Sequence, residues 1–227
     1  FTVASFWSGE IALASQHLDA MIARYNSTEH PEFVFCYGED PHIQPAFYRV
    51  WLLWFLGYPD QAHLQHQAAM RQAQAVASPH NLAFALNFSA YFYQFCRETS
   101  QVQTQVKAEI SLSSKQGFPH WMGTGAILQG WARTIQESDE AGIAEIQRGL
   151  SVYQATGAQV GMTYLRALLA EAYGHMGEGE AGRQVLAEAL ADMESRGERF
   201  CEAELYRLDG DLLLMQDDSR VQEAEAV

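Results

Sequence analysis

Lysine, proline and cysteine are scarce in this chain of 227 residues, which has two lysines, six prolines and three cysteines. No apolar run approaches the roughly 18 residues that a membrane-spanning helix needs, so we expect no membrane segment. The cysteines, Cys36, Cys96 and Cys201, are odd in number and form no CxxC pair, which argues against a disulfide framework and a zinc site. We therefore expect a reducing, cytoplasmic setting.

Positive charge is also in short supply. The net charge is −14, and the segment 178–227 carries 14 acidic residues against five arginines. Such a surface repels phosphate backbones, so we expect no nucleic-acid binding. A protein partner with a basic segment is compatible with it. Hydrophobic residues make up 48% of the chain and charged residues 19%, which is a globular composition.

Catalytic motifs are missing as well. The sequence contains no HExxH, GxSxG, GxGxxG or EF-hand loop. Three weak candidates have ordinary explanations. His30-Pro31-Glu32 lacks the PCxxC half of a deaminase signature, His63 and His66 lack a third ligand, and Gly123-Thr124-Gly125 follows no strand. We predict no catalytic residues, no metal and no cofactor.

What the chain does have is a period of forty residues. Gly117, Gly157 and Gly197 each follow one amphipathic stretch and precede another, as expected for glycines that end helices. A second series of polar or turn-forming sites has the same spacing: Gly57, Arg97, Glu137, Gly177 and Asp217. Two turns in every forty residues predict two helices of about 15 to 18 residues per unit.

Apolar periodicity supports this division. In 180–196, Ala181, Val185, Leu186, Ala189 and Leu190 form one stripe at helical spacing. The other helix of each unit is richer in aromatic residues and apolar nearly all round. These predicted helices are His42–Leu56, Asn81–Phe95, Trp121–Ile135, Met162–Met176 and Glu198–Met215. No strand pattern of comparable length occurs, so we predict an all-α fold.

Small residues recur seven positions before one turn series and five positions after it, for example Gly130 with Gly142 and Ala170 with Gly182. Glycine within a helix costs about 1 kcal/mol against alanine, so its use there indicates closely packed backbones. With Tyr173, this spacing resembles the tetratricopeptide repeat, although the period is forty residues and not thirty-four. The resemblance implies a right-handed superhelix of antiparallel helix pairs, an α-solenoid.

We predict one domain over 1–227, with units at 1–25, 42–78, 79–117, 118–157, 158–197 and a truncated 198–227. The first unit contributes one helix, 11–25. The insertion 26–41 either folds over a groove or plugs the first repeats. The chain begins with Phe1 and its end shows no cap, so we expect a longer parent protein or pairing of this end with another copy.

Several segments carry a more specific resemblance: GYPDQA (57–62), YFYQFCRE (91–98), KQGFPHW (115–121), ILQGWA (127–132), ATGAQVG (155–161), LLAEAYG (168–174) and AELYRLDGDLLL (203–214). They resemble the C-terminal repeat region of bacterial signalling proteins that join a class III adenylate or guanylate cyclase, or a kinase, to a predicted ATPase. The resemblance implies a non-enzymatic scaffold that binds a protein or peptide, or another copy of itself, and regulates the attached enzyme.

In tetratricopeptide repeats the first helix of each pair lines a concave groove. Transferred to this chain, that pattern predicts a groove formed by Trp51, Trp54, Asn87, Tyr91, Trp131, Tyr164, Glu171, Arg207 and Asp211. Neighbouring groove positions are Gln44, Phe47, Phe55, Gln94, Thr124, Ile127, His175 and Glu204. For Trp51 and Trp131, packing between repeats is an equal alternative. A second hypothesis is a small-molecule sensor in which Trp51, Trp54 and Trp131 stack on a sugar-like ligand.

The acidic stretch 202–211 suggests a carboxylate cluster, but helical geometry argues otherwise. Adjacent helical residues point about 100° apart, so Asp209 and Asp211 point about 160° apart and cannot share one metal. We expect Asp211 to line the groove with Arg207 and Glu204, and Asp209 to face a neighbouring surface.

Overall fold

A computed structural model describes residues 1–24, 42–76 and 78–216 of the chain. Over this part it is all-helical, as predicted, and contains no strand. The helices are α1 Thr2–Trp7, α2 Ile11–Arg24, α4 Ile43–Phe55, α5 Pro59–Ala75, α6 Pro79–Phe95, α7 Thr99–Gln116, α8 Pro119–Glu137, α9 Glu140–Ala155, α10 Met162–His175, α11 Gly179–Arg196 and α12 Glu202–Gln216. The insertion 26–41, with His30-Pro31-Glu32, and the segment 217–227 lie outside the described residues.

Turn chemistry places the helix ends. Pro59, Pro79 and Pro119 stand in the first turn of their helices, where a missing N–H costs nothing. Left-handed residues end helices or follow them at Gly57, Gly117, Gly157, Gly177 and Gly197. Among the described residues, two other than glycine adopt this conformation, Arg97 with φ 63° and Ser138 with φ 50°. The predicted turn position 137 is thus displaced by one residue, and position 97 is occupied by an arginine.

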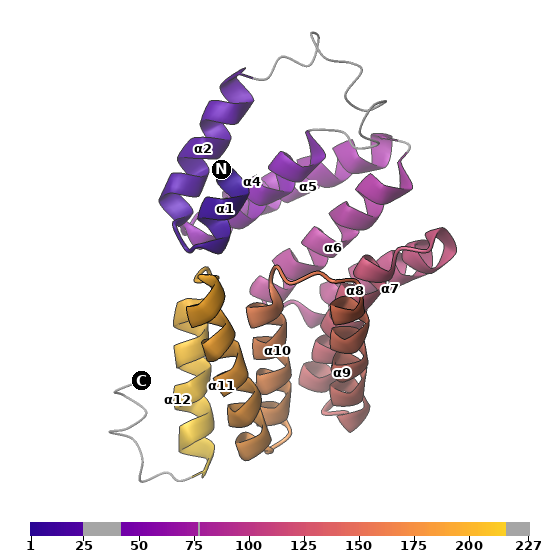
Figure 1. The fold of residues 1–227 in the computed structure, drawn as a ribbon. Coiled ribbons are helices and arrows are strands. Elements are labelled where there is room, and N and C mark those ends of the chain that lie inside the picture. The colour runs from indigo at the N-terminus through magenta and orange to yellow at the C-terminus, as the bar shows by residue number, and fades with distance from the viewer. Residues whose placement is uncertain (25–41, 77, 217–227) are drawn as a thin grey trace.

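Consecutive helices run antiparallel and form two layers (Figure 1). In the first layer α4, α6, α8, α10 and α12 each contact the next helix of the set, and α2 contacts α4. The helices α5, α7, α9 and α11 pack against this layer as partners of their sequence neighbours. Most of the apolar core lies between the layers, where Phe47, Phe92 and Ile146 are fully buried.

The helix backbones pack closely at the small residues, as the sequence predicted. A Cβ atom built on Gly142 would lie 2.6 Å from the carbonyl oxygen of Gly130, and one on Gly182 would lie 3.0 Å from that of Ala170. Neither position could take a larger side chain without separating the two helices of its pair.

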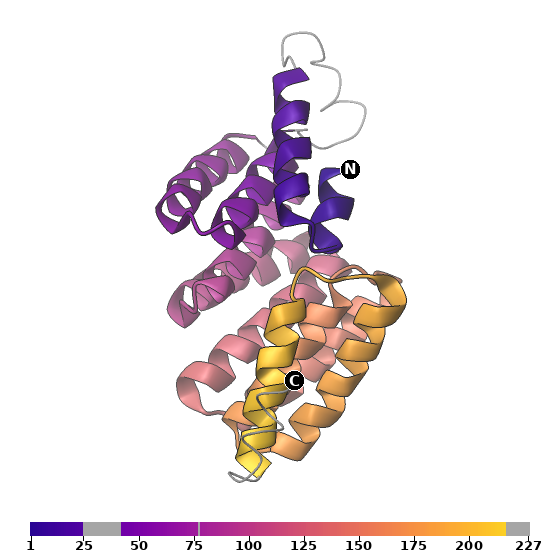
Figure 2. The same ribbon diagram turned by 90° about the vertical axis from the view of Figure 1, so that its left-hand side faces the viewer.

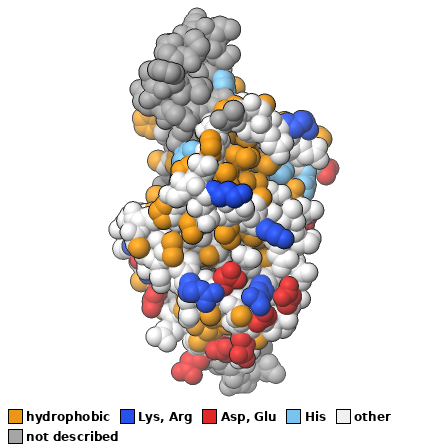
Figure 3. Space-filling model, turned by 90° about the vertical axis from the view of Figure 1, so that its right-hand side faces the viewer, with side chains coloured by type: hydrophobic (Ala, Val, Ile, Leu, Met, Phe, Trp, Pro, Cys, Tyr) orange, Lys and Arg blue, Asp and Glu red, His pale blue; other side chains and the backbone are white. Residues whose placement is uncertain are grey.

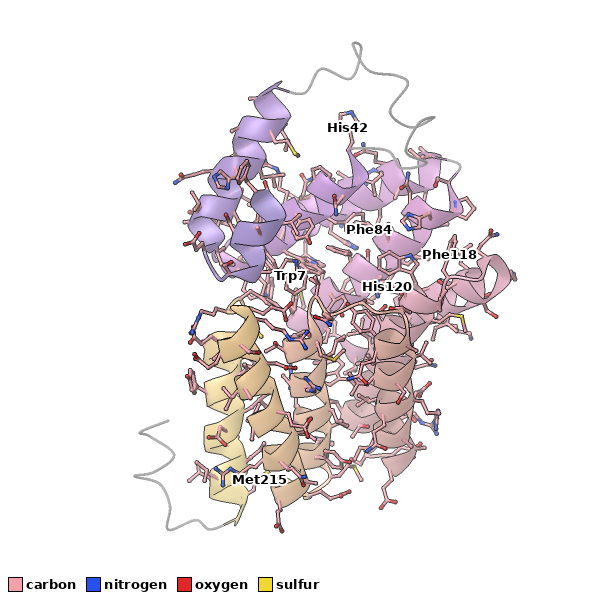
Figure 4. All side chains as sticks on the ribbon, viewed as in Figure 1. Trp7, His42, Phe84, Phe118, His120 and Met215 are labelled. Atoms are coloured by element: carbon pink, nitrogen blue, oxygen red, sulfur yellow. The ribbon has the colours of Figure 1, made fainter. Side chains whose placement is uncertain are left out.

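The first helix, α1, meets the turn between α11 and α12, a contact that the sequence did not predict. The main-chain N–H of Arg199 donates to the carbonyl of Trp7 at 2.8 Å, and the rings of Phe6 and Phe200 have centroids 5.2 Å apart. Two perpendicular views place α1 beside the turn between α11 and α12 (Figures 1 and 2). Figure 4 shows Trp7 at this junction, with Met215 at the opposite end of α12. The first helix layer therefore curls until its ends touch.

The structure departs from the prediction at two places near this junction. The helix predicted at 11–25 is present as α2, but a short helix α1 that was not predicted precedes it, and α12 begins at Glu202 and not at Glu198. The residues before α12 are held by other partners, because Glu198 accepts a hydrogen bond from the main-chain N–H of Gly161 at 2.8 Å. The tertiary contacts override the helical pattern of this segment.

The surface differs from one end of the molecule to the other. On the face shown in Figure 3, hydrophobic side chains are exposed mainly in the upper part, acidic side chains gather in the lower part, and basic side chains occur in both. Among the described residues, no helix is both long and apolar enough to cross a membrane.

Candidate binding pocket

A cavity of about 590 Å³, which we call the aromatic pocket, lies among the described helices. It opens where the curled ends of the first layer approach each other, between the ends of α4 and α6 and the starts of α10 and α12. Its lining residues are Trp54, Phe55, Gln94, Phe95, Arg97, Tyr164, Phe200, Cys201, Ala203, Glu204 and Arg207. Five of the eleven are aromatic, so an occupant meets mainly ring faces and edges.

A packed aromatic cluster forms the walls. The ring of Phe55 lies 5.1 Å from that of Phe95, and the ring of Phe95 lies 5.7 Å from that of Tyr164. Phe200 closes the circuit with a centroid distance of 5.4 Å to Tyr164. Such contacts hold the rings in fixed orientations. The pocket is therefore preformed by side chains from four separate segments.

Tyr164 and Gln94 supply the polar groups of the pocket wall. The Tyr164 hydroxyl donates a hydrogen bond to the Gln94 side-chain oxygen, and both residues are buried. Burial raises the pKa of Tyr164 well above its usual value, and the charge of Glu171 adds to the effect. The hydroxyl consequently stays protonated and remains a hydrogen-bond donor over the physiological pH range.

A smaller polar pocket of about 260 Å³ adjoins the aromatic pocket. Both are lined by Arg97 and Arg207, which therefore separate them. The polar pocket adds Ile135, Glu171, Gly174, His175, Leu208, Asp211, Leu212 and Met215. Three carboxylates, from Glu171, Glu204 and Asp211, thus accompany two guanidinium groups on the combined surface.

Ion pairs fix both arginines. Arg97 binds Glu171 and stands over the Trp131 ring, with its guanidinium carbon 5.3 Å from the ring centroid. Burial lowers the pKa of Arg97, but the hydrogen bond and charge of Glu171 outweigh this, so the pKa is raised. Arg207 donates to both oxygens of Glu204 at 2.7 Å, and this pairing raises its pKa. Both side chains therefore remain positively charged.

Five of the nine predicted groove residues line these two pockets. Trp54 and Tyr164 lie in the aromatic pocket, Glu171 and Asp211 in the polar pocket, and Arg207 in both. They come from α4, α10 and α12, so helices far apart in the sequence meet at one place.

The other four predicted residues lie elsewhere. Trp51 is stacked on Phe88 at 4.2 Å and has 1% of its surface exposed. Trp131 is fully buried and donates its indole N–H to Glu171 at 2.8 Å. Both tryptophans pack between helices, which was the alternative to a groove position. They offer no ring face to a ligand.

Asn87 and Tyr91 are also taken up by internal contacts. The Asn87 amide donates to Glu109 and to Thr124, each at 2.8 Å, in the buried interior. Tyr91 is half-buried against Trp51, at a centroid distance of 5.4 Å. Burial raises its pKa well above the usual value. Among the neighbouring predicted positions, Phe55, Gln94 and Glu204 line the aromatic pocket and His175 the polar pocket.

The remaining candidates from the sequence also receive a place. Gly123 to Gly125 lie within α8, where Thr124 is buried, so no phosphate can reach them at a helix start. Asp209 binds Arg183 of α11 at 3.0 Å, whereas Asp211 binds Arg207 of its own helix. The two aspartates thus have different partners, as their positions on the helix predicted.

Pocket residues that the sequence reasoning missed include Phe95, Arg97, Phe200 and Cys201. Arg97 had one sequence signal, since it stands at a turn position that two other units fill with glycine, Gly57 and Gly177. Phe200 and Cys201 had none, because their segment was assigned to a helix. Comparisons with protein families, with curated proteins and with solved structures find no match to this chain.

Proposed function

We propose that the chain is a non-enzymatic binding module, a right-handed superhelix of tetratricopeptide-like units over 1–227, that captures a protein or peptide partner. The observation that carries the proposal is the aromatic pocket, a preformed apolar cavity bordered by two fixed arginines. Aromatic and arginine side chains are the residues that most often dominate binding energy at protein interfaces. Through the resemblance of its repeats, the module would act in the cytoplasm on an attached signalling ATPase or cyclase.

The pocket suits one apolar anchor side chain with basic neighbours. Its aromatic walls would bury the anchor, and the adjoining surface carries three carboxylates against two arginines. The chain as a whole has a net charge of −14, which favours a basic partner segment at long range. The fixed pairing of Arg97 with Glu171 leaves no unpaired cation there to clamp a terminal carboxylate.

A small-molecule sensor is the second candidate, because the pocket volume of about 590 Å³ is typical of ligand cavities. The sugar-stacking version of this idea loses two of its three tryptophans to the core and keeps only Trp54. A compact, largely apolar compound with one group that donates a hydrogen bond to the Tyr164 hydroxyl oxygen fits better, because the proton of that hydroxyl is already donated to Gln94.

Peptide binding tests the first proposal. We would measure fluorescence anisotropy with labelled peptides that carry one aromatic or branched aliphatic residue, flanked by basic residues in one set and by acidic residues in the other. We expect saturable binding of the basic set that weakens with salt. The variants Trp54→Ala, which removes part of the pocket wall, and Glu204→Gln, which removes one carboxylate, should weaken it. The controls Tyr58→Ala and Tyr206→Ala, which change exposed aromatics outside the pocket, should keep it.

Other outcomes would point elsewhere. Failure of both peptide sets, with a saturable rise in melting temperature caused by small apolar compounds and abolished by Trp54→Ala, would favour the sensor. Concentration-dependent dimerisation that Trp54→Ala leaves intact would favour self-association through a repeat end. A hydrolytic activity that copurifies with the wild-type chain and is lost in a pocket variant would overturn the non-enzymatic assignment.

A further inference from the structure

Three ligand-type side chains converge beside the turn between α6 and α7, and none of the three lines either pocket. They are His63 of α5, Cys96 at the end of α6 and Glu98 at the start of α7. One imidazole nitrogen, the thiol sulfur and one carboxylate oxygen all lie within 4.8 Å of one another. In a tetrahedral zinc site, bonds of about 2.0 to 2.3 Å place neighbouring donor atoms roughly 3.5 Å apart. Small side-chain rotations would therefore complete such a site.

The three donors are not committed to other partners in the described part of the chain. Glu98 stands at the N-cap of α7, yet its carboxylate accepts no hydrogen bond from the helix. His63 and Cys96 make no side-chain hydrogen bond there, although the His63 ring packs at 4.9 Å from that of Phe92. The lone pairs of these three side chains therefore remain available to bind an ion.

The neighbouring histidine behaves differently. His66 is buried, and its Nε2 lies 2.8 Å from the Ser89 hydroxyl. The sequence pairs His63 with His66 by their spacing on one helix, but the structure groups His63 with Cys96 and Glu98 instead. The two ligands that the structure places beside His63, Cys96 and Glu98, come from a turn more than thirty residues away in the sequence.

We propose that His63, Cys96 and Glu98 form a Zn²⁺ site with one position left to water. A nitrogen, a thiolate and a carboxylate are all ligands that zinc accepts, and thiolate disfavours Mg²⁺ and Ca²⁺. The ion would clip α5 to the turn between α6 and α7. This site does not depend on the proposed partner binding.

A divalent cation would hold the Glu98 carboxylate and the Cys96 sulfur together, because it offsets the repulsion between two anionic ligands. Zinc is bound by thiolate and not by thiol, so the thiol proton leaves to solvent when the metal binds.

Cobalt provides the test, since Co²⁺ bound by thiolate gives an intense charge-transfer absorption that oxygen and nitrogen ligands do not. The full chain would carry Cys36→Ser, be freed of metal with a chelator, and be titrated with Co²⁺ and then with Zn²⁺. We expect one equivalent of Co²⁺ to produce the band and Zn²⁺ to remove it. In Cys96→Ser the band should vanish, and in Cys201→Ser it should persist.

Two further variants identify the other ligands. His63→Ala and Glu98→Gln should each weaken Zn²⁺ binding by more than about tenfold. Loss of a residue that only hydrogen-bonds to a ligand already costs about tenfold or more, so loss of a ligand itself should exceed that. The matched control is Glu178→Gln, because Glu178 also stands at the N-cap of its helix without capping it. Circular dichroism and urea denaturation would show that each variant is folded. No binding to the folded wild-type chain, or binding that survives Cys96→Ser and His63→Ala, would overturn the site.

Discussion

Replacement of Gly142 by alanine should destabilise the protein, although alanine is the better helix former. The substitution gains about 1 kcal/mol of helix propensity. Against this, the new Cβ would lie 2.6 Å from the Gly130 carbonyl oxygen and 2.2 Å from the Thr134 hydroxyl. Thr134 is fully buried, and the carbonyl belongs to the backbone of α8, so neither can retreat without moving a helix.

Overpacking of this kind typically costs about 1 to 3 kcal/mol, and backbone contacts lie at the upper end. We therefore expect a net loss of roughly 2 kcal/mol in the free energy of unfolding, measured by urea denaturation with an unchanged slope. The matched control is Gly174→Ala, another buried helical glycine. Its Cβ would meet the end of the Leu212 side chain at 2.7 Å, which can rotate away.

The free energy of unfolding of the control variant should lie within about 1 kcal/mol of that of the wild type, because the gain in helix propensity offsets the cost of a small side-chain rearrangement. If Gly142→Ala were as stable as Gly174→Ala, or more stable than the wild type, α8 and α9 would not pack at this distance. The close helix pairing that underlies the proposed repeat architecture would then be wrong.

Three other predictions concern the interior and the junction of the two ends. Burial lowers the pKa of His66 to about 4, so the unfolded state binds more protons than the folded state between pH 6.5 and 4. As the pH falls through this range, the wild type should lose roughly 3 kcal/mol of stability relative to His66→Asn, measured by urea denaturation. Burial raises the pKa of Glu109 well above its usual value despite the Asn87 hydrogen bond. Above about pH 4.5 the unfolded state loses the proton that the folded state keeps, so the stability of the wild type falls as the pH rises. By the same assay, Glu109→Gln should become increasingly more stable than the wild type. Phe200→Ala should cost about 3 to 5 kcal/mol and increase hydrogen exchange in α1, because the ring packs 4.8 Å from Trp7; unchanged exchange would contradict the closed arrangement.

Most helix positions could be predicted from the sequence, because one helix of each unit buries a stripe at helical spacing and the other is an apolar segment too long for a strand. Turn positions could also be predicted where a glycine adopts the left-handed conformation, as at Gly57 and Gly177. The short α1 escaped because six residues cannot establish a period. The start of α12 was misplaced because hydrogen bonds of Glu198 and Arg199 to distant segments decide it.

The pocket was predicted only in part for a different reason. Transfer of a repeat register assigns residues to an open concave face, and it found Trp54, Tyr164 and Arg207. It does not reveal how far the first layer curls. Because the ends meet at Phe6 and Phe200, the interior of the curve is filled by aromatic side chains, and Trp51 becomes part of that packing.

Arg97 joins these lines of reasoning. The left-handed conformation costs a residue with a Cβ atom about 1 kcal/mol or more, and Gly57 and Gly177 avoid that cost at corresponding turns. At position 97 the cost is tolerated while the side chain binds Glu171, covers Trp131 and borders both pockets. A local departure from the best turn residue is expected where function, and not folding, constrains the choice. The backbone strain at Arg97 and the position of its guanidinium between the two pockets therefore mark the same surface that we propose for partner binding.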